Sequence, residues 1–212
     1  MDVASILGGK WDFRIEHKGI KIFSSRVSGS DIHGFKGELE LKVSLKTLIS
    51  LFNDMANYTR WVQHLAEMEI LEKVDATEYI VRQVLNVPWP MQQREVIMRT
   101  RLVGAGDNAL AIAMQEEPDY LPLNPKYHRV RHARGSWVFT PDGHGVVQVI
   151  FVMHLDPGND VPAAASNAGM FEVPFYTLNN LRNLLQDKSY NPPWPQELEQ
   201  YLSIIEDFPS TP

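Results

Sequence analysis

The residues that could do chemistry in this sequence are mainly histidines and arginines, because it contains seven histidines and no cysteine. The lack of cysteine excludes disulfides, thiolate metal sites and cysteine nucleophiles. His128 and His132 are four residues apart in the strand-like run "YHRVRHARGSWVF"; that spacing separates them by about 13 Å, too far to share a metal ion. No G-x-S-x-G, P-loop, G-x-G-x-x-G or H-E-x-x-H motif is present. We therefore expect no metal site, no cofactor and no catalytic motif.

Arg94 is the charged residue whose position most suggests ligand binding. It begins the run "REVIMRTRLVG", in which strand alternation places Arg94, Val96 and Met98 on one face. If that face lines a cavity, the guanidinium must be paired, because the free-energy cost of burying an unpaired charge is prohibitive. Its partner is either a carboxylate or phosphate of a ligand or an acid of the protein, such as Asp156 or Glu95.

Length and composition predict one globular domain. The chain has 212 residues, 44% hydrophobic and 22% charged, with a net charge of -6, which argues against nucleic-acid binding. No apolar run approaches the roughly 18 residues needed to span a bilayer, and the first residues do not read as a secretion signal. The sequence as given predicts a monomer in the cytoplasm, or in the periplasm if a native signal peptide has been removed.

The elements that must position these residues are mostly strands. Period-2 and β-branched runs predict three strands within residues 12–43 and six between 67 and 157. Short turns between them imply an antiparallel sheet of about nine strands, which must curl strongly. Leu45–Met55 has helical spacing behind the capping residue Ser44. We expect a long helix over residues 162–187, kinked at Pro174, and so an α+β fold.

The stretch "NVPWPMQQ", residues 86–93, interrupts two of these strands with a tryptophan between two prolines. Proline fixes φ near -65° and stiffens the loop. Trp89 at its centre either covers the mouth of a cavity, dips into a membrane interface, or packs on the edge of its own domain.

Several segments together resemble the START domain, the StAR-related lipid-transfer module. They are PWP, Arg94–Glu95, "YHRVRHARGSWVFTPDG", "DPGNDVPAAASN" and "VPFYTLNNLRNLL". The resemblance is strongest to bacterial members and implies the helix-grip fold, a curved antiparallel sheet around a long C-terminal helix with an internal tunnel. We expect residues 1–190 to form this domain and residues 191–212 a proline-rich tail with one short helix.

The resemblance implies that the protein binds one hydrophobic ligand, a lipid, and contacts membranes transiently. The 86–93 loop and the C-terminal helix would form the gate. The resemblance also implies that sterol-binding members carry an acid–base pair near the positions of Val81 and Thr100, which are uncharged here; this argues against a sterol held in that manner and leaves a fatty acyl or phospholipid ligand open. The predicted ligand-binding residues are Trp61, Met68, Val84, Trp89, Arg94, Val96, Met98, Met114, Arg129, Phe151, Met153, Phe171, Phe175 and Leu178.

The alternative is an enzyme of the same superfamily, of the aromatase/cyclase or hydrolase-like type. Such chemistry would use polar groups in the tunnel to polarise a bound carbonyl, and Arg94, Tyr127, Arg129 and His154 are the candidates. Because no compact acid–base cluster is visible in the sequence, we favour binding over catalysis.

Overall fold

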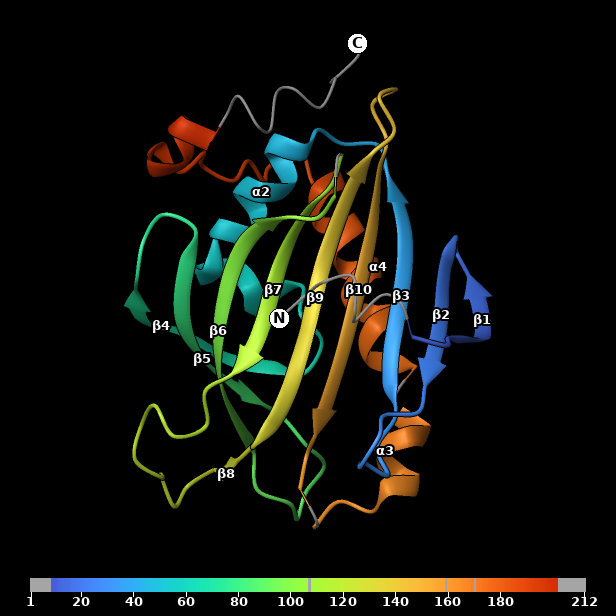
Figure 1. Ribbon diagram of the computed structural model, residues 1–212, viewed down its shortest axis with the longest axis vertical. Coiled ribbons are helices and arrows are strands. Elements are labelled where there is room, and N and C mark those ends of the chain that lie inside the picture. The colour runs from blue at the N-terminus through green and yellow to red at the C-terminus, as the bar shows by residue number, and fades with distance from the viewer. Residues whose placement is uncertain (1–8, 107, 159, 170, 202–212) are drawn as a thin grey trace.

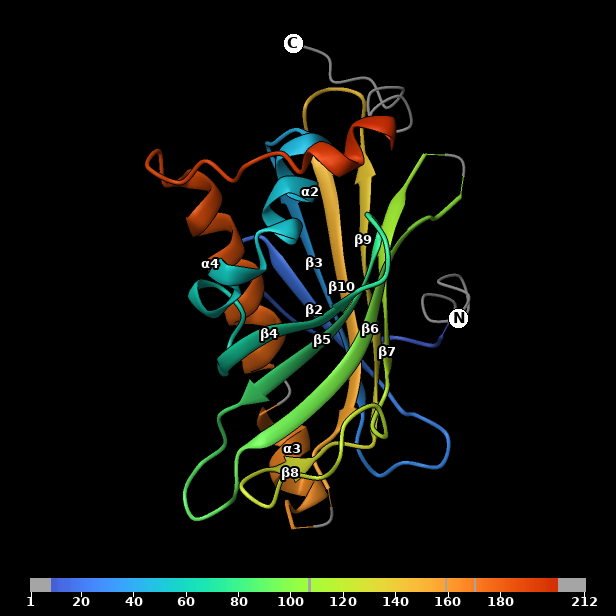
Figure 2. The same cartoon turned by 90° about the vertical axis from the view of Figure 1, so that its left-hand side faces the viewer.

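A computed structural model describes residues 9–106, 108–158, 160–169 and 171–201 (Figure 1). Its main feature is one large, strongly curved sheet, with helices on the concave side (Figure 2). The strands follow the order β1-β2-β3-β10-β9-β7-β6-β5-β4, and the short β8 pairs with β6. All pairings are antiparallel except that of β8 with β6. The predicted sheet of about nine antiparallel strands is confirmed.

The strand bounds follow the alternating runs of the sequence closely. The first half contains β1 (Asp12–His17), β2 (Ile20–Ser25), β3 (Gly34–Leu41), β4 (Leu65–Lys73) and β5 (Glu78–Leu85), and the second half β6 (Arg94–Gly104), β7 (Leu110–Glu116), β8 (His128–Arg129), β9 (His132–Pro141) and β10 (Val147–Asp156).

The first hairpin shows how local chemistry sets these bounds. Lys18 and Gly19 connect β1 to β2 with φ values of 51° and 71°. Two successive positive φ values are those of the two-residue hairpin turn whose twist matches the twist of the strands.

Two helical segments follow β3. Helix α2 (Leu45–Asn53) starts at Ser44, whose hydroxyl accepts a hydrogen bond from the Thr47 amide at 3.1 Å, as predicted. The 3-10 helix η1 (Met55–Arg60) continues directly from it. Both contribute to the main hydrophobic core, which fills the concave side of the sheet.

The C-terminal helical region differs from the predicted kinked helix. It consists of α3 (Ala163–Gly169) and a separate α4 (Glu172–Gln186). Pro174 is the third residue of α4, where its missing N–H has no helical acceptor to lose. The predicted kink at Pro174 is therefore wrong, because the helix breaks before the proline and not at it.

Helix α4 is the one that the sheet grips. Its buried residues Thr177, Leu178, Leu181 and Leu184 recur at helical spacing, and it packs on β2 and β3. The closest approach is at Gly37 of β3, where a Cβ would lie 2.6 Å from Leu178 Cδ1. A side chain at position 37 would push the helix away.

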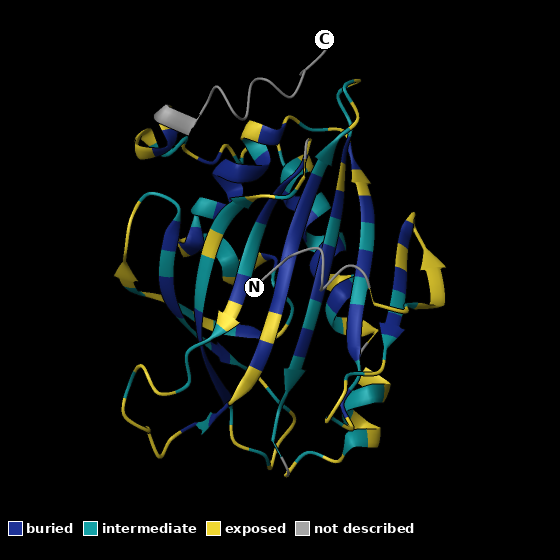
Figure 3. Ribbon diagram, viewed as in Figure 1, coloured by how far each residue is buried: buried dark blue, intermediate teal, exposed yellow. Residues whose placement is uncertain are grey.

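The helices cover the concave face of the sheet (Figure 2), and β9 and β10 are buried along much of their length (Figure 3). The convex face has a small apolar cluster around Ala109, Ala111 and Val138 and a network of ion pairs. None of the helices among the described residues is long and apolar enough to cross a membrane.

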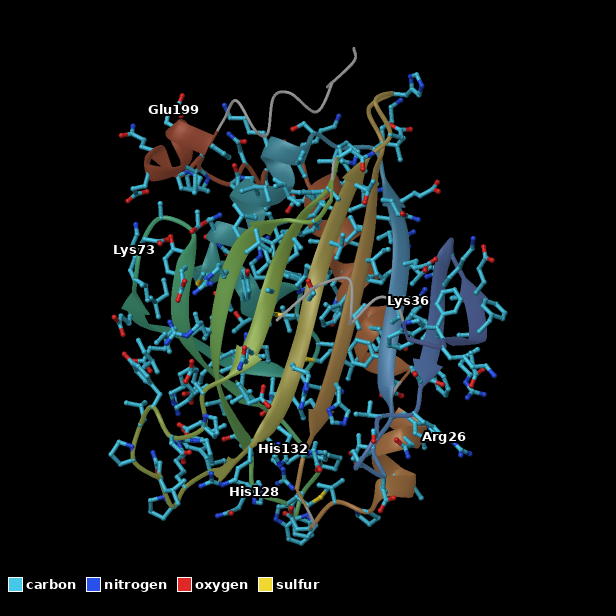
Figure 4. The ribbon with its side chains drawn as sticks, viewed as in Figure 1. Arg26, Lys36, Lys73, His128, His132 and Glu199 are labelled. Atoms are coloured by element: carbon cyan, nitrogen blue, oxygen red, sulfur yellow. The ribbon has the colours of Figure 1, made fainter. Side chains whose placement is uncertain are left out.

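The segment after α4 runs back over α2 and ends in the 3-10 helix η2 (Gln196–Tyr201). Tyr190 donates to Asp54 Oδ2 at 2.8 Å, and Leu198 is buried in the main core. Lys73 at the end of β4 forms a 2.9 Å ion pair with Glu197, close to where Figure 4 labels Lys73 and Glu199. The described part of the tail therefore packs on the domain.

Candidate functional site

A cavity lies between the α2–η1 segment and the concave face of the sheet. The space open to the centre of a water-sized sphere is about 80 Å³, and all empty space out to the mouth is about 790 Å³. Its walls come from α2, η1, the β4–β5 turn, and strands β4 to β7, β9 and β10. The lining residues are Ile49, Phe52, Asn53, Met55, Tyr58, Trp61, Val62, Met68, Ala76, Thr77, Tyr79, Gln83, Thr100, Arg101, Leu102, Ile112, Met114, Trp137, Phe151 and Met153.

One part of the wall is a cluster of aromatic rings. Phe52 meets Trp61 and Trp137 edge to face at centroid distances of 5.2 and 4.9 Å. Trp137 stacks on Phe151 at 4.0 Å with the planes 2° apart. Such pairs stabilise the core beyond their buried area, so this part of the wall is rigid.

Another part of the wall consists of methionines. Met114 and Met153 both pair with Gly135 in the sheet, so the two thioethers flank a position without a side chain. Met68 on β4 faces the same space. Methionine has three rotatable bonds and adapts to irregular shapes, so this part of the wall can change shape.

Tyr58 belongs to the cavity wall, but its hydroxyl group is hydrogen-bonded within the protein. The hydroxyl donates to the Phe52 carbonyl at 2.7 Å, and burial, with smaller contributions from Tyr190 and Asp54, raises the pKa of Tyr58. It therefore stays neutral and contributes its ring to the wall.

The cavity wall is almost free of charge. Among the described lining residues Arg101 alone is charged; its side chain is 54% exposed and pairs with Glu78 at 2.5 Å. Val81 and Thr100, near which the resemblance implies an acid–base pair in sterol-binding members, are uncharged; Val81 is buried in the core beside the cavity and Thr100 lines it. A charged ligand group would find no partner deep in this site.

The predicted ligand-binding residues fall into three groups. Trp61, Met68, Met114, Phe151 and Met153 line the cavity. Val96, Met98 and Leu178 are buried in the core that surrounds it but do not line it. The structure does not bring the other predicted residues to the wall.

Val84 and Arg129 lie on the convex face. Val84 pairs with Glu95, and Glu95 forms a 2.7 Å ion pair with Arg129. Arg129 also donates to the carbonyls of Leu121 and Pro122 at 3.0 and 3.1 Å, so it fixes the loop that covers this face. Although burial opposes ionisation, the hydrogen bonds from Arg82 and Arg129 lower the pKa of Glu95, which keeps it charged.

Phe171 and Phe175 belong to the break before α4 and to its first turn. Phe171 is exposed, and Phe175 is half-buried and lies 5.4 Å from the ring of His17 on β1. Phe175 therefore lies near β1, and neither ring is among the lining residues of this cavity.

Trp89 is at the tip of the 86–93 loop and is 91% exposed. Gln92 of the same loop donates to the Pro125 carbonyl at 3.1 Å, which joins it to the loop that carries the exposed Leu123. Two apolar side chains thus protrude from neighbouring loops at one end of the molecule. Of the three positions considered for Trp89, packing on the edge of its own domain does not occur in the structure.

Arg94 ties this end of the molecule together. It is 1% exposed and donates to the Pro157 carbonyl at 2.9 Å, to Asp160 Oδ1 at 2.6 Å, and to the Gln92 carbonyl. The 86–93 loop is therefore held to the loop before α3. Of the two partners considered for Arg94, the structure supplies an acid of the protein, Asp160.

His128 and His132 lie at the same end of the sheet (Figure 4). The Nδ1 atom of His128 is 4.0 Å from Asp160 Oδ1, and its ring packs against Gly158, where a Cβ would lie 2.2 Å from Nε2. The described residues contain no group of three or more His, Cys, Asp or Glu side chains able to hold a metal ion.

Sequence reasoning missed the lining residues Phe52, Tyr58, Gln83, Ile112 and Trp137. The position of Trp137 could have been inferred from the sequence, because it lies two residues after Gly135 and therefore on the same face of β9. The position of Phe52 could have been inferred as well, since it is the last residue of the apolar stripe of α2. No sequence signal pointed to Gln83, because a polar residue in a strand is normally expected on the solvent side.

A curved antiparallel sheet that grips one helix and encloses an apolar cavity defines a helix-grip domain. The START domain family model matches residues 16–199, and the chain belongs to the START domain family. The uncharacterized protein PA1579 of Pseudomonas aeruginosa is 25% identical over 182 residues, 86% of this chain and 90% of that protein.

Solved structures agree with this assignment. The STAR-related lipid transfer protein from Xanthomonas axonopodis (fragment 25–204) is 31% identical, with a TM-score of 0.77 over 84% of this chain and 99% of that one. Human STARD10 shares the fold, with a TM-score of 0.70 and 16% identity over 93% of this chain and 79% of that one.

Proposed function

We propose that the protein binds one lipid in the cavity beneath α2 and carries it between membranes or presents it to a partner. The observation that carries this proposal is the enclosed, almost uncharged apolar cavity in a chain of the START family. The similarity to the Xanthomonas protein, which is named a lipid transfer protein, supports it as well.

Burial of an alkyl chain supplies the affinity. Each CH₂ removed from water contributes roughly 0.8 kcal/mol, so a ten-carbon chain gains about 8 kcal/mol before the losses of association. The open space of about 80 Å³ is smaller than the roughly 300–1,000 Å³ of typical ligand pockets. Binding therefore requires Met68, Met114 and Met153 to move.

The gate of this proposal is the 86–93 loop together with α3. Trp89 protrudes from it and would enter the membrane interface, where an indole ring is favoured. Opening would separate this loop from the loop before α3 and so break the hydrogen bonds of Arg94 with Pro157 and Asp160.

The enzymatic alternative depends on polar groups inside the cavity. Arg94, Tyr127, Arg129 and His154 are not among its lining residues. Arg129 is bonded to Glu95 on the convex face, and His154 contacts Ser30 at 3.2 Å. No observation favours the enzyme over the carrier.

Native mass spectrometry of the purified protein, followed by solvent extraction, tests the proposal. We expect one adduct of lipid mass per chain, released by the solvent, and the same spectrum checks the predicted monomer. A protein without an adduct that also takes up no lipid from phosphatidylcholine vesicles would refute the carrier function.

A further inference from the structure

Polar groups inside an apolar cavity are informative because each must be satisfied by the protein, by water or by a ligand. Most of those in this wall are satisfied by the protein. Tyr58 donates to the Phe52 carbonyl, Thr77 to Asp75, Thr100 to the Tyr79 carbonyl, and Asn53 to the Ile49 carbonyl.

Three lining side chains have polar groups with no hydrogen-bond partner within the described chain, namely the Gln83 amide and the indole N–H groups of Trp61 and Trp137. The side-chain polar atoms that are both buried and unpartnered belong to Trp11, Trp61, His154 and Ser166. Since Gln83 and Trp137 are not among them, their polar atoms are open to a water-sized sphere.

Gln83 is placed to meet the polar end of a ligand. On β5 it shares the concave face with Val81 and pairs with Met68 on one side and Val96 on the other, so its neighbours in the sheet are apolar. It lies four residues from Tyr79 toward the 86–93 loop, about 13 Å along the strand. The amide therefore stands at the gate side of the cavity, and the aromatic cluster lies deeper.

The chemistry of this position selects a class of ligand. A glutamine amide both donates and accepts hydrogen bonds, so it suits a hydroxyl or carbonyl oxygen. It cannot neutralise a charge, and the one charged lining residue in the described chain, Arg101, is already paired with Glu78. A carboxylate or ammonium group here would lose its hydration without gaining a counter-charge.

We propose that the Gln83 amide is the polar anchor of the cavity and selects a neutral lipid with a hydroxyl or carbonyl oxygen over one with a charged head. Long-chain alcohols and acylglycerols have this chemistry. The inference rests on the proposed lipid-binding function and adds to it the class of ligand and its orientation, with the oxygen toward the gate and the chain toward Trp61 and Trp137.

The test uses twelve-carbon chains that carry bromine at one end, because bromine quenches tryptophan fluorescence and Trp61 and Trp137 line the cavity. The probes are 12-bromododecan-1-ol, 12-bromododecanoate and 1-bromododecane, titrated into the full-length protein. The variants are Gln83→Leu and the unbranched Gln83→Met. Gln148→Leu, at an exposed position of β10, is the control.

The measured quantity is the affinity for the alcohol divided by the affinity for bromododecane. One neutral hydrogen bond accounts for a factor of about 2 to 10, and we expect this ratio to fall by that factor in both Gln83 variants and to be unchanged in Gln148→Leu. We also expect wild-type protein to bind the alcohol more tightly than the carboxylate at pH 8.

Each other outcome has a separate meaning. If all probes bind and the ratio is the same in every variant, water and not the ligand satisfies Gln83, and the anchor is refuted while lipid binding stands. Tighter binding of the carboxylate would refute the selection for neutral heads. If no probe binds wild-type protein, the proposed function itself fails.

Discussion

Replacement of Arg94 by methionine is expected to destabilise the protein by about 2–4 kcal/mol. The guanidinium is 1% exposed and bonds to Asp160, Pro157 and Gln92. Hydrogen bonds of charged groups contribute roughly 1.5–3 kcal/mol each, and breaking a buried ion pair costs about 3–5 kcal/mol. The lower range applies here, because the Asp160 side chain is 48% exposed and regains water in the variant.

Urea unfolding and hydrogen exchange measure this effect. Arg94→Met should lower the free energy of unfolding and speed amide exchange in both loops that Arg94 joins, the 86–93 loop and the loop before α3. Asp160→Asn should have a smaller effect in the same places. The control is Arg131→Met, whose ion pair with Asp119 at 3.2 Å is exposed on both sides and should contribute about 0–1 kcal/mol.

This experiment also separates the two roles considered for Arg94. If Arg94 holds the gate closed, its removal changes stability and loop exchange and leaves the affinity for bromododecanol within about twofold after correction for folding. If stability and exchange are unchanged while the affinity for an acidic ligand falls, Arg94 contacts the ligand, and our description of it as a structural tie is refuted.

Three further predictions follow from single positions. Trp89→Ala should slow lipid transfer from vesicles more than it weakens equilibrium binding, because the indole is exposed and does not line the cavity; equal effects in a fluorescent-lipid assay would contradict the gate role. Leu198→Ala should lower the free energy of unfolding by about 2–5 kcal/mol in urea, since Leu198 is 1% exposed in the core; a loss below about 0.5 kcal/mol would show that the tail is not docked. Burial, with Arg134 nearby, lowers the pKa of His154, so as the pH falls below about 6.5 the unfolded chain protonates first and the folded state loses stability; His154→Gln should flatten this loss between pH 7 and 5, and an unchanged slope would refute it.

The sheet could be predicted from the sequence because alternation of apolar and polar residues is a local signal. The same signal placed Val96 and Met98 correctly on the concave face. It failed at Val84, because on β5 the apolar Ile80 and Val84 are buried on the convex face, while the polar Gln83 faces the cavity. A strand buried on both sides no longer shows in its alternation which side faces the cavity.

The site was harder to predict because its contacts join distant parts of the chain. The partner of Arg94 is 66 residues away, and no local pattern encodes that pairing. Phe171 and Phe175 do not reach the wall, since one continuous helix over residues 162–187, kinked at Pro174, was the basis for placing them there, and the structure has two separate helices. The α2–η1 segment, which covers the cavity, was predicted as a helix, but its position over the sheet follows only from the assembled core.

Two sets of contacts hold segments together at opposite ends of the domain, and their energies bear on where the proposed lipid would enter. At one end Arg94 ties two loops together, and at the other the tail packs Leu198 into the core and pairs Glu197 with Lys73. Releasing the Arg94 contacts costs about 2–4 kcal/mol by the estimate above, whereas withdrawing the tail also exposes Leu198 and breaks the bond between Tyr190 and Asp54. Burial of a ten-carbon chain gains roughly 8 kcal/mol before the losses of association, which is more than the cost of releasing the Arg94 contacts. We therefore expect the proposed lipid to enter at the Arg94 end, where Trp89 is exposed and where Gln83 would offer the entering molecule a hydrogen bond.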